Sequence, residues 1–292
     1  MEFALSDNSY LVPYDGSFRV ANAPTAPREA PSKKAYKKAL AAQVDRLADL
    51  QDLLYAADKH AVLLVFQAMD AAGKDSTIRA VMSGVNPAGF QVSSFKAPSK
   101  NELDHDFLWR TAKALPQRGR IGIFNRSYYE ETLVVRVHPE YLGGQRLPAQ
   151  PESIWEDRYA SIRDHELHLA RNGTVVIKFW LNVSRKEQTS RFLRRIERAD
   201  KNWKFSAGDL AESALWDQYM EAYEAMLNAT SRPHAPWYAI PADDKPSMRL
   251  AVADVVVETL SNLDLRYPDL DAKTRANLDA YRTQLEDTLA GF

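Results

Sequence analysis

Cysteine is absent from the 292 residues of this sequence. Its absence excludes disulfides, thiolate metal centres and cysteine nucleophiles, and it fits a reducing compartment. Long apolar runs are missing as well, because none approaches the roughly 18 residues that a membrane-spanning helix needs. The first residues lack the basic-then-apolar pattern of a secretion signal. We therefore expect a cytoplasmic protein with no membrane partner.

An excess of charge of either sign is also absent. The chain has 38 basic and 39 acidic residues and a formal net charge of -1, so no global field would draw it onto nucleic acid. No nucleic-acid partner is expected, and any polyanionic ligand must bind a local basic patch. The length and a hydrophobic content of 45% allow a full buried core, in one large domain or in one domain with appendages.

Residues 1–31 contain four prolines and little hydrophobic periodicity. This predicts an extended N-terminal arm that lies on the surface or on a partner subunit, with disorder as the alternative. From Ser32 onward, apolar residues recur at steps of three and four as far as Leu54, which predicts one long amphipathic helix. Four lysines within residues 33–38 oppose the dipole of that helix, which is mildly unfavourable unless an anion lies nearby. A solvated helix face is the usual explanation of such lysines.

Strand-like runs alternate with helical stretches over the rest of the chain. The runs lie at 61–67, 90–95, 120–124, 174–181 and 236–241, and the helical stretches near 101–114, 209–229, 247–264 and 270–290. Ser99 and Glu102 form a capping-box pattern before the first of these helices. Such alternation predicts an α/β fold, a parallel sheet flanked by helices in three layers, with ligands at the carboxyl ends of the strands. We expect a main domain over 32–268 and a C-terminal helix within 269–292.

The segment after the strand at 61–67 has the layout of a phosphate-binding P-loop. A small-residue turn, Ala68-Met-Asp-Ala-Ala-Gly73, leads into Lys74 and a helix. In such a loop, backbone N–H groups surround phosphate oxygens while the lysine and the helix N-terminus add positive charge. We expect the phosphate contacts from Ala71, Ala72, Gly73, Lys74, Asp75 and Ser76. Ala68 and Asp75 depart from the consensus, and the alternative is an ordinary strand–turn–helix corner.

Two carboxylates, Asp70 and Asp75, would flank the bound phosphate. Carboxylates beside phosphate are tolerable only if a cation bridges them, which predicts Mg²⁺. We assign Asp70 to the metal, because Asp75 at a helix N-terminus is already stabilised by the dipole. A second candidate segment follows the strand at 120–124, where Asn125 stands in the position of a Walker B acid and Arg126 could bind phosphoryl oxygens. A surface ion pair is the alternative for Arg126.

The segment from Arg185 to Lys204 holds eight basic residues and three acidic ones. Four arginines at positions 191, 194, 195 and 198 fall on one face of a helix, where like charges repel unless an anion neutralises them. A solvated face is the usual explanation of a charge run. Because this run follows the end of a strand, it favours an arginine-rich lid at about 185–210 that closes over phosphates, or a binding surface for a long polyanion.

Several motifs occur together in one order: Gln67-Ala-Met-Asp-Ala-Ala-Gly-Lys-Asp-Ser-Thr77, Phe124-Asn-Arg-Ser-Tyr-Tyr-Glu-Glu131, Val134-Val-Arg-Val-His-Pro-Glu140, Arg191-Phe-Leu-Arg-Arg195, Lys201-Asn-Trp-Lys-Phe-Ser206, Trp216-Asp-Gln-Tyr219 and Ala235-Pro-Trp-Tyr-Ala-Ile-Pro241. Over about residues 35–265, the sequence closely resembles the family-2 polyphosphate kinases. The resemblance implies a P-loop kinase-like fold with a helical lid, and reversible phosphoryl transfer between inorganic polyphosphate and the adenine nucleotides AMP, ADP and ATP. It also implies Mg²⁺ and a homo-oligomer.

The resemblance gives each matching residue an expected role. Lys74 would hold phosphates, Asp70 would serve Mg²⁺ and Arg126 would bind the transferring phosphoryl group. Arg191 and Arg195 would close from the lid, and the other basic residues of the lid would extend this polyphosphate path, namely Arg194, Lys201 and Lys204. Asn125 together with Glu130 resembles the subgroup that phosphorylates both AMP and ADP, so these two residues are expected at the nucleotide.

The expected mechanism is a direct in-line transfer from polyphosphate to the nucleotide, with no phosphoenzyme. Its catalytic residues would be Asp70, Lys74, Arg126 and Arg191, which position and neutralise two anionic reactants. Two alternatives stay open. The protein could be an ATP-dependent nucleoside or nucleotide kinase with a similar loop and lid, or a non-catalytic module that binds polyphosphate or nucleotide.

Overall fold

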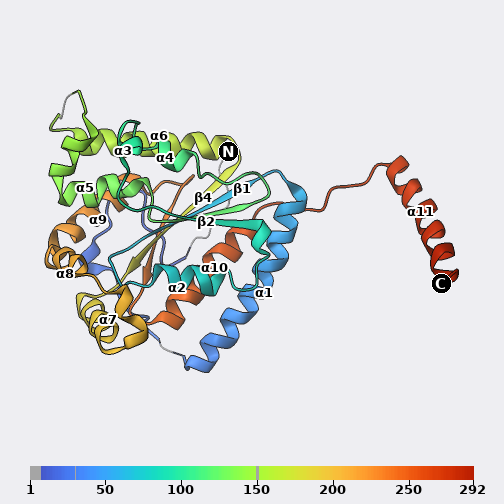
Figure 1. Ribbon diagram of the computed structural model, residues 1–292, viewed down its shortest axis with the longest axis horizontal. Helices are drawn as coiled ribbons and strands as arrows, with labels where there is room; N and C mark the ends of the chain where they lie inside the picture. The colour runs from blue at the N-terminus through green and yellow to red at the C-terminus, as the bar shows by residue number, and fades with distance from the viewer. Residues whose placement is uncertain (1–7, 30, 149–150) are drawn as a thin grey trace.

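The computed structural model describes residues 8–29, 31–148 and 151–292. Within this part of the chain, five strands form one parallel sheet in the order β2-β3-β1-β4-β5 (Figure 1). They are β1 (Ala61–Gln67), β2 (Phe90–Ser94), β3 (Ile121–Asn125), β4 (Thr174–Asn182) and β5 (Trp237–Pro241). The predicted strands and the predicted α/β fold are thereby confirmed. All residues of β1 and β5 are buried, as expected for strands covered on both faces.

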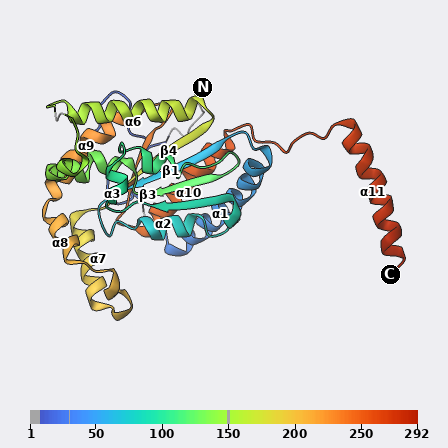
Figure 2. The same ribbon diagram turned by 45° about the horizontal axis from the view of Figure 1, so that its top comes forward.

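Helices cover both faces of the sheet. The α-helices are α1 (Lys33–Ala57), α2 (Lys74–Val81), α3 (Lys100–Leu103), α4 (Trp109–Ala112), α5 (Val134–Val137), α6 (Ile154–Arg171), α7 (Arg185–Glu197), α8 (Ala207–Ala214), α9 (Trp216–Thr230), α10 (Lys245–Ser261) and α11 (Ala272–Ala290). Short 3₁₀ segments are η1 (Val20–Asn22), η2 (Pro87–Gly89), η3 (Tyr128–Thr132), η4 (Pro139–Gln145) and η5 (Ala199–Lys204). Helices α1, α2 and α10 lie on one face of the sheet, and α6 and α9 lie on the other (Figures 1 and 2).

Two predicted helices are divided in the structure. The helix expected over 101–114 consists of α3 and α4, because Asp106 accepts a hydrogen bond from the Leu108 N–H (2.9 Å) and so replaces a helical bond with a local turn. The capping box of Ser99 and Glu102 is confirmed at the start of α3. The helix expected over 209–229 is divided at Leu215 into α8 and α9.

The described part of the N-terminal arm lies on its own chain. The Val12 N–H donates to the Trp237 carbonyl (2.9 Å), and the Ala239 N–H donates to the Tyr10 carbonyl (2.7 Å), so residues 10–12 run along the edge strand β5. Further on, the Phe18 N–H donates to Asn228 of α9 (3.0 Å). Residues 1–7 and Ala30 of the predicted arm lie outside the described residues.

The sheet brings the ends of its three central strands together. Phe66, near the end of β1, pairs with Asn125 at the end of β3 and with Phe179 of β4. The loops that follow β1, β3 and β4 therefore start side by side at the carboxyl edge of the sheet.

At the opposite end of the molecule, α11 stands apart from the domain (Figure 1) and has no buried residue. None of the helices in the described ranges has the length and apolarity that a bilayer span needs.

Candidate phosphate-transfer site

The loop between β1 and α2 has the backbone geometry of an anion-binding turn. Ala71 (φ 61°) and Gly73 (φ 114°) adopt left-handed conformations, which curl residues 68–73 around the start of α2. A left-handed alanine is uncommon and is a form of local strain that concentrates at functional sites. The Lys74 ammonium lies over this loop and donates to the Ala68 carbonyl (2.7 Å). Burial, with a further contribution from Arg126, lowers the pKa of Lys74 to about 8.

Arg126 joins the loop after β1 to the loop after β3. Its guanidinium contacts the carboxylates of Asp70 (2.6 Å) and Glu130 (3.1 Å). The Arg126 backbone is left-handed (φ 64°), and its N–H donates to the Phe66 carbonyl (3.1 Å), which turns the side chain toward the P-loop. Glu130 is the main cause of a raised pKa at Arg126, with burial opposing it and Asp70 adding to it. The guanidinium is therefore a fixed positive charge between two carboxylates.

A second contact joins β3 to the start of α2. The Asn125 side-chain amide donates to the Asp75 carboxylate (2.6 Å). Asn125 stands in the position of a Walker B acid. Its side-chain amide and the Asp75 carboxylate attract each other, whereas two carboxylates at this distance would repel. The structure thus brings together Asp70, Lys74, Asp75, Asn125, Arg126 and Glu130, all of which the sequence had singled out.

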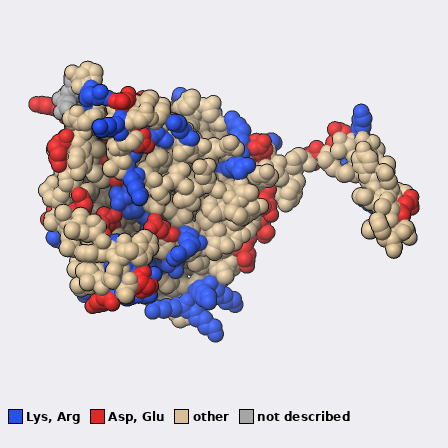
Figure 3. Space-filling model, viewed as in Figure 1, with Lys and Arg blue, Asp and Glu red and all other residues tan. Residues whose placement is uncertain are grey.

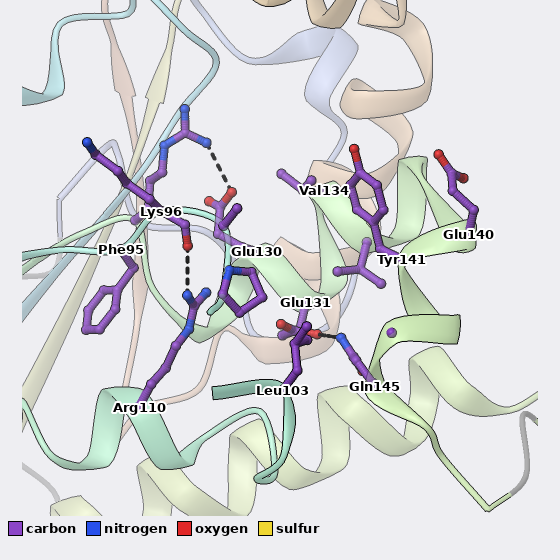
Figure 4. A pocket seen from close by; sticks show the side chains of 15 residues that line it. Phe95, Lys96, Leu103, Arg110, Glu130, Glu131, Val134, Glu140, Tyr141 and Gln145 are labelled. Carbon is purple, nitrogen blue, oxygen red and sulfur yellow. Dashed lines mark hydrogen bonds and ion pairs between the residues drawn. The ribbon is translucent and has the colours of Figure 1, made fainter. Parts of the chain in front are cut away.

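Two cavities meet at Arg126 and Glu130. The smaller, about 200 Å³, lies between the P-loop and the start of α9 and includes Asp70 and Tyr223 in its wall. The larger, about 740 Å³, is lined by Phe95, Lys96 and Arg110 on one side and by η4 on the other. Figure 4 shows Glu130 above the centre of this larger cavity, between Lys96 and Val134. The Arg126–Glu130 pair therefore forms the boundary between a phosphate-sized space and a space large enough for a nucleoside.

The lid, which we define as α7, η5 and α8, contacts the P-loop directly. The Gln188 amide donates to the Asp70 carbonyl (3.0 Å) and its oxygen accepts from the Ser213 hydroxyl (2.7 Å). The P-loop therefore contacts the arginine-rich helix α7, and it shares the smaller cavity with Glu212 of α8. In Figure 2 the lid projects from the body below α9.

Arg191 differs from its expected place on an exposed face of α7. Its side chain is only 4% exposed. Its two terminal nitrogens donate to the carbonyls of Ala71 and Ala72 in the P-loop and to those of Ala242 and Asp243 after β5. Its Nε donates to Glu187 (2.8 Å). Because all five N–H donors of the guanidinium are engaged, Arg191 holds three loops together in this conformation.

Several other basic residues of the lid are paired locally. Arg194 contacts Glu187 (2.7 Å), Arg195 contacts Asp209 (3.0 Å) and Lys201 contacts Asp200 (3.1 Å). Lys204 lies over the ring of Trp203. Burial raises the pKa of Asp209, the partner of Arg195, and the carboxylate of Asp70 raises it further, so this ion pair lies within electrostatic reach of the P-loop.

Comparison with known proteins identifies the family of this chain. The family model described as Polyphosphate kinase 2 (PPK2) matches residues 30–268. The chain belongs to the polyphosphate kinase 2 family. The segments of this resemblance at 67–77, 124–131, 134–140 and 216–219 contribute residues to the two cavities.

Relatives of this PPK2 chain are similar over most of its length. An ADP-polyphosphate phosphotransferase from Rhodopseudomonas palustris is 56% identical over 257 residues, which cover 87% of this chain and 89% of that protein. An AMP/ADP-polyphosphate phosphotransferase from Meiothermus ruber is 47% identical over 81% of this chain and 85% of that protein. The crystal structure of Polyphosphate Kinase 2 from Arthrobacter aurescens TC1 superposes with a TM-score of 0.83 at 37% identity, covering 96% of this chain and 99% of that one.

Sequence reasoning missed a buried polar network behind the site of this PPK2 chain. Lys178 in β4 is fully buried and contacts Glu166 of α6 (2.6 Å), the Tyr129 hydroxyl (2.8 Å) and the Thr230 carbonyl (2.8 Å). The hydroxyls of Tyr128 and Tyr129 donate to Glu166. These tyrosines directly precede Glu130, so the network fixes the loop that carries Arg126. The available signal was a lysine inside an otherwise apolar strand, which requires a buried partner.

Proposed function

We propose that this chain transfers a phosphoryl group between inorganic polyphosphate and nucleotides and so converts AMP to ADP and ADP to ATP. The observation that carries the proposal is the position of Arg126, which contacts Asp70 of the P-loop and Glu130 of the neighbouring loop at the boundary of two cavities. Phosphoryl transfer needs a positioned cation between two anionic reactants, and a guanidinium suits phosphoryl oxygens because of its planar fork. The names of the relatives support the same reaction.

In this proposal, the larger cavity receives the nucleoside of the acceptor. Asn125 and Glu130 lie at the edge of the site nearest the transferred group, and the terminal phosphate of the nucleotide points toward Arg126. The end of the polyphosphate lies over Ala71, Ala72, Gly73, Asp75 and Ser76, with the Lys74 ammonium beside it. The nucleotide oxygen then attacks the terminal phosphorus in line, and the shortened polyphosphate leaves with the electron pair of the broken bond. No covalent intermediate with the protein is required.

Mg²⁺ fits the carboxylates of this site. No group of three or more His, Cys, Asp or Glu side chains gathers as a metal site within residues 8–29, 31–148 and 151–292. This suits Mg²⁺, which is usually held by one or two carboxylates together with phosphates and water. Asp70 lines the smaller cavity and is the residue that would hold it. When bound, Mg²⁺ would neutralise charge on the reacting phosphates.

The lid has two tasks in the proposal. Arg191 acts as a positioning residue, because its contacts with Ala71 and Ala72 fix the curvature of the P-loop. Arg194, Arg195 and Lys201 exchange their local carboxylate partners for polyphosphate as the lid closes, and Lys204 leaves the Trp203 ring to bind it. Exposed ion pairs of this kind are worth about 0 to 1 kcal/mol, so exchanging them costs little.

The decisive experiment mixes the purified protein and magnesium with long-chain polyphosphate and, in separate reactions, AMP, ADP or GDP, and follows the nucleotides by chromatography. We expect formation of ADP from AMP and of ATP from ADP. Transfer from ATP alone, with none from polyphosphate, would show an ATP-dependent kinase instead. Saturable binding without turnover would show a non-catalytic module.

Replacing Asp70 or Lys74 with alanine is expected to abolish transfer, because each removes a group that positions or neutralises the reacting phosphates. Replacing Arg126 with alanine should lower kcat by about 10³-fold or more. Initial rates measure these effects, and circular dichroism verifies folding. Lys59→Ala is the matched control, since Lys59 is exposed beside the opposite end of β1. Wild-type rates in the Asp70 or Lys74 variant would contradict the assigned roles.

A further inference from the structure

A second group of cations lies beside the P-loop, outside the site described above. Arg79 projects from α2, and Lys245 and Arg249 lie on successive turns of α10. Helix α10 packs on α2, and Met248 reaches within 3.2 Å of the position that a β-carbon on Gly73 would occupy. The start of α10 therefore lies next to the phosphate loop.

These three cations have no carboxylate partner within 4 Å among the described residues, in contrast to Arg191, Arg194 and Arg195 of α7. The Nε of Arg249 is buried without a hydrogen-bond partner. Burial lowers the pKa of Lys245, and the guanidiniums of Arg191, Arg194 and Arg249 lower it further. Burial and Arg79 do the same to Arg249. Cations held together in this way repel one another, and an anion would relieve the repulsion.

The start of α1 continues this positive surface. Gln43 of α1 bonds to Asp254 of α10 (2.7 Å), and Arg46 bonds to Ser261 (2.9 Å), so the two helices run side by side in the same direction. Residues 33–38 are therefore level with the first turns of α10. All four lysines in that range are exposed. Figure 3 shows Lys and Arg gathered at the lower edge of the molecule, where α1 begins in Figure 1.

We propose that Arg79, Lys245, Arg249 and the four lysines within 33–38 form a binding track for the distal part of a long polyphosphate chain. The proposal rests on the proposed function, because it assigns a place to the phosphates that extend beyond the reacting end. The track begins where Lys245 adjoins the P-loop and leads away along α10 and α1. It gives a reason for four lysines at a helix N-terminus, where they are otherwise unfavourable. In this arrangement the phosphates of a three-phosphate substrate lie at the P-loop, and only a longer chain extends along the track.

The test compares tripolyphosphate with long-chain polyphosphate as phosphoryl donor to ADP, using the full chain and magnesium. The readout is the KM for the long chain divided by the KM for tripolyphosphate, in phosphate units. In the triple variant Arg79→Ala, Lys245→Ala, Arg249→Ala we expect this quotient to rise about tenfold. We also expect log KM for the long chain to depend less steeply on log salt concentration, because fewer phosphates are neutralised. Arg171→Ala is the matched control, because Arg171 is an exposed arginine at the end of α6, just before β4 begins.

A second variant keeps the proposal testable if the triple variant fails to fold. Lys33, Lys34, Lys37 and Lys38 are all exposed, so replacing the four with alanine leaves the core intact, and this variant should raise the same quotient. An unchanged quotient in both variants would overturn the track, whereas a wild-type protein that uses neither donor would overturn the proposed function instead. A triple variant with an unchanged quotient but weaker binding of single-stranded RNA than the wild type would show a nucleic-acid surface and would also overturn the track.

Discussion

Single residues at this site hold conformations and charges that cost free energy on their own. Ala71 and Arg126 have left-handed backbones, and Lys74 carries its charge in a buried position. Each is supported by its neighbours, since Arg191 binds the carbonyl of Ala71 and the carboxylates of Asp70 and Glu130 enclose Arg126. Strain of about 1–3 kcal/mol per residue is characteristic of functional sites and persists only where the surroundings fix it. The loop is thus prepared for an anion before one binds.

The lowered pKa of Lys74 predicts a pH dependence of polyphosphate binding. With its pKa at about 8, the lysine of the free protein is charged at pH 7 and loses its charge as the pH rises through 8 to 9. The dissociation constant for polyphosphate should therefore rise over that range, as calorimetry at each pH would measure.

Lys74→Arg separates this effect from other titrations. An arginine stays protonated throughout, so binding by the variant should change little between pH 7 and 9, whatever its affinity. If the variant and the wild type weaken in parallel, Lys74 is not the titrating group.

At the scale of elements, the loops of the site depend on contacts between helices and strands that are distant in sequence. The network of Lys178 and Glu166 connects β4, α6 and η3, and Arg191 connects α7 to the loops after β1 and β5. Loops that carry function must be positioned by a rigid scaffold. Here the scaffold acts through fully paired buried charges, which fix geometry more than they add stability.

Breaking the buried pair should be costly. Lys178→Met leaves Glu166 buried without its cation, which is expected to lower the free energy of unfolding by about 3–5 kcal/mol. Replacing both residues with apolar ones, Lys178→Met with Glu166→Leu, should recover much of this loss while kcat stays low, because Tyr128 and Tyr129 lose their acceptor. Urea unfolding and steady-state kinetics measure the two effects. Lys273→Met, an exposed change on α11, is the control, and an equal loss in this control would argue against the network.

At the scale of the molecule, the domain and α11 behave as separate units. Residues 269–292 are exposed throughout, including the apolar side chains of Leu278, Tyr281, Leu285 and Leu289. The family match ends at residue 268. Stability and catalysis should therefore reside in the domain, and the predicted homo-oligomer stays a prediction.

A chain that ends at Pro268 tests this division. We expect its unfolding temperature to stay within about 2 °C of the full chain, because changes at exposed positions usually alter stability by no more than about 0.5 kcal/mol. Light scattering on both proteins would show whether α11 contributes to assembly, since only an interface through α11 lowers the number of subunits on truncation. A fall of the unfolding temperature by more than about 5 °C would mean that α11 packs on the domain in solution.

The sequence by itself determined the strands, the P-loop and the residues that meet at its edge. These features depend on local patterns: apolar runs bounded by turn residues, a small-residue loop before Lys74, and the rule that parallel strands end on the same side. Asp70, Asn125 and Arg126 lie at or just after the ends of neighbouring strands, so their proximity could be predicted once the parallel sheet had been predicted.

Only the tertiary structure decided how charges are partnered. Helical spacing placed Arg191 with Arg194, Arg195 and Arg198, but it could not show that carbonyls from two distant loops take all its donors. Nor could it show that Glu166 neutralises Lys178, or that α1 and α10 lie side by side. Electrostatic and hydrogen-bonding partners are set by distance in space, and contacts between different helices, strands and loops leave no periodic signal in the sequence.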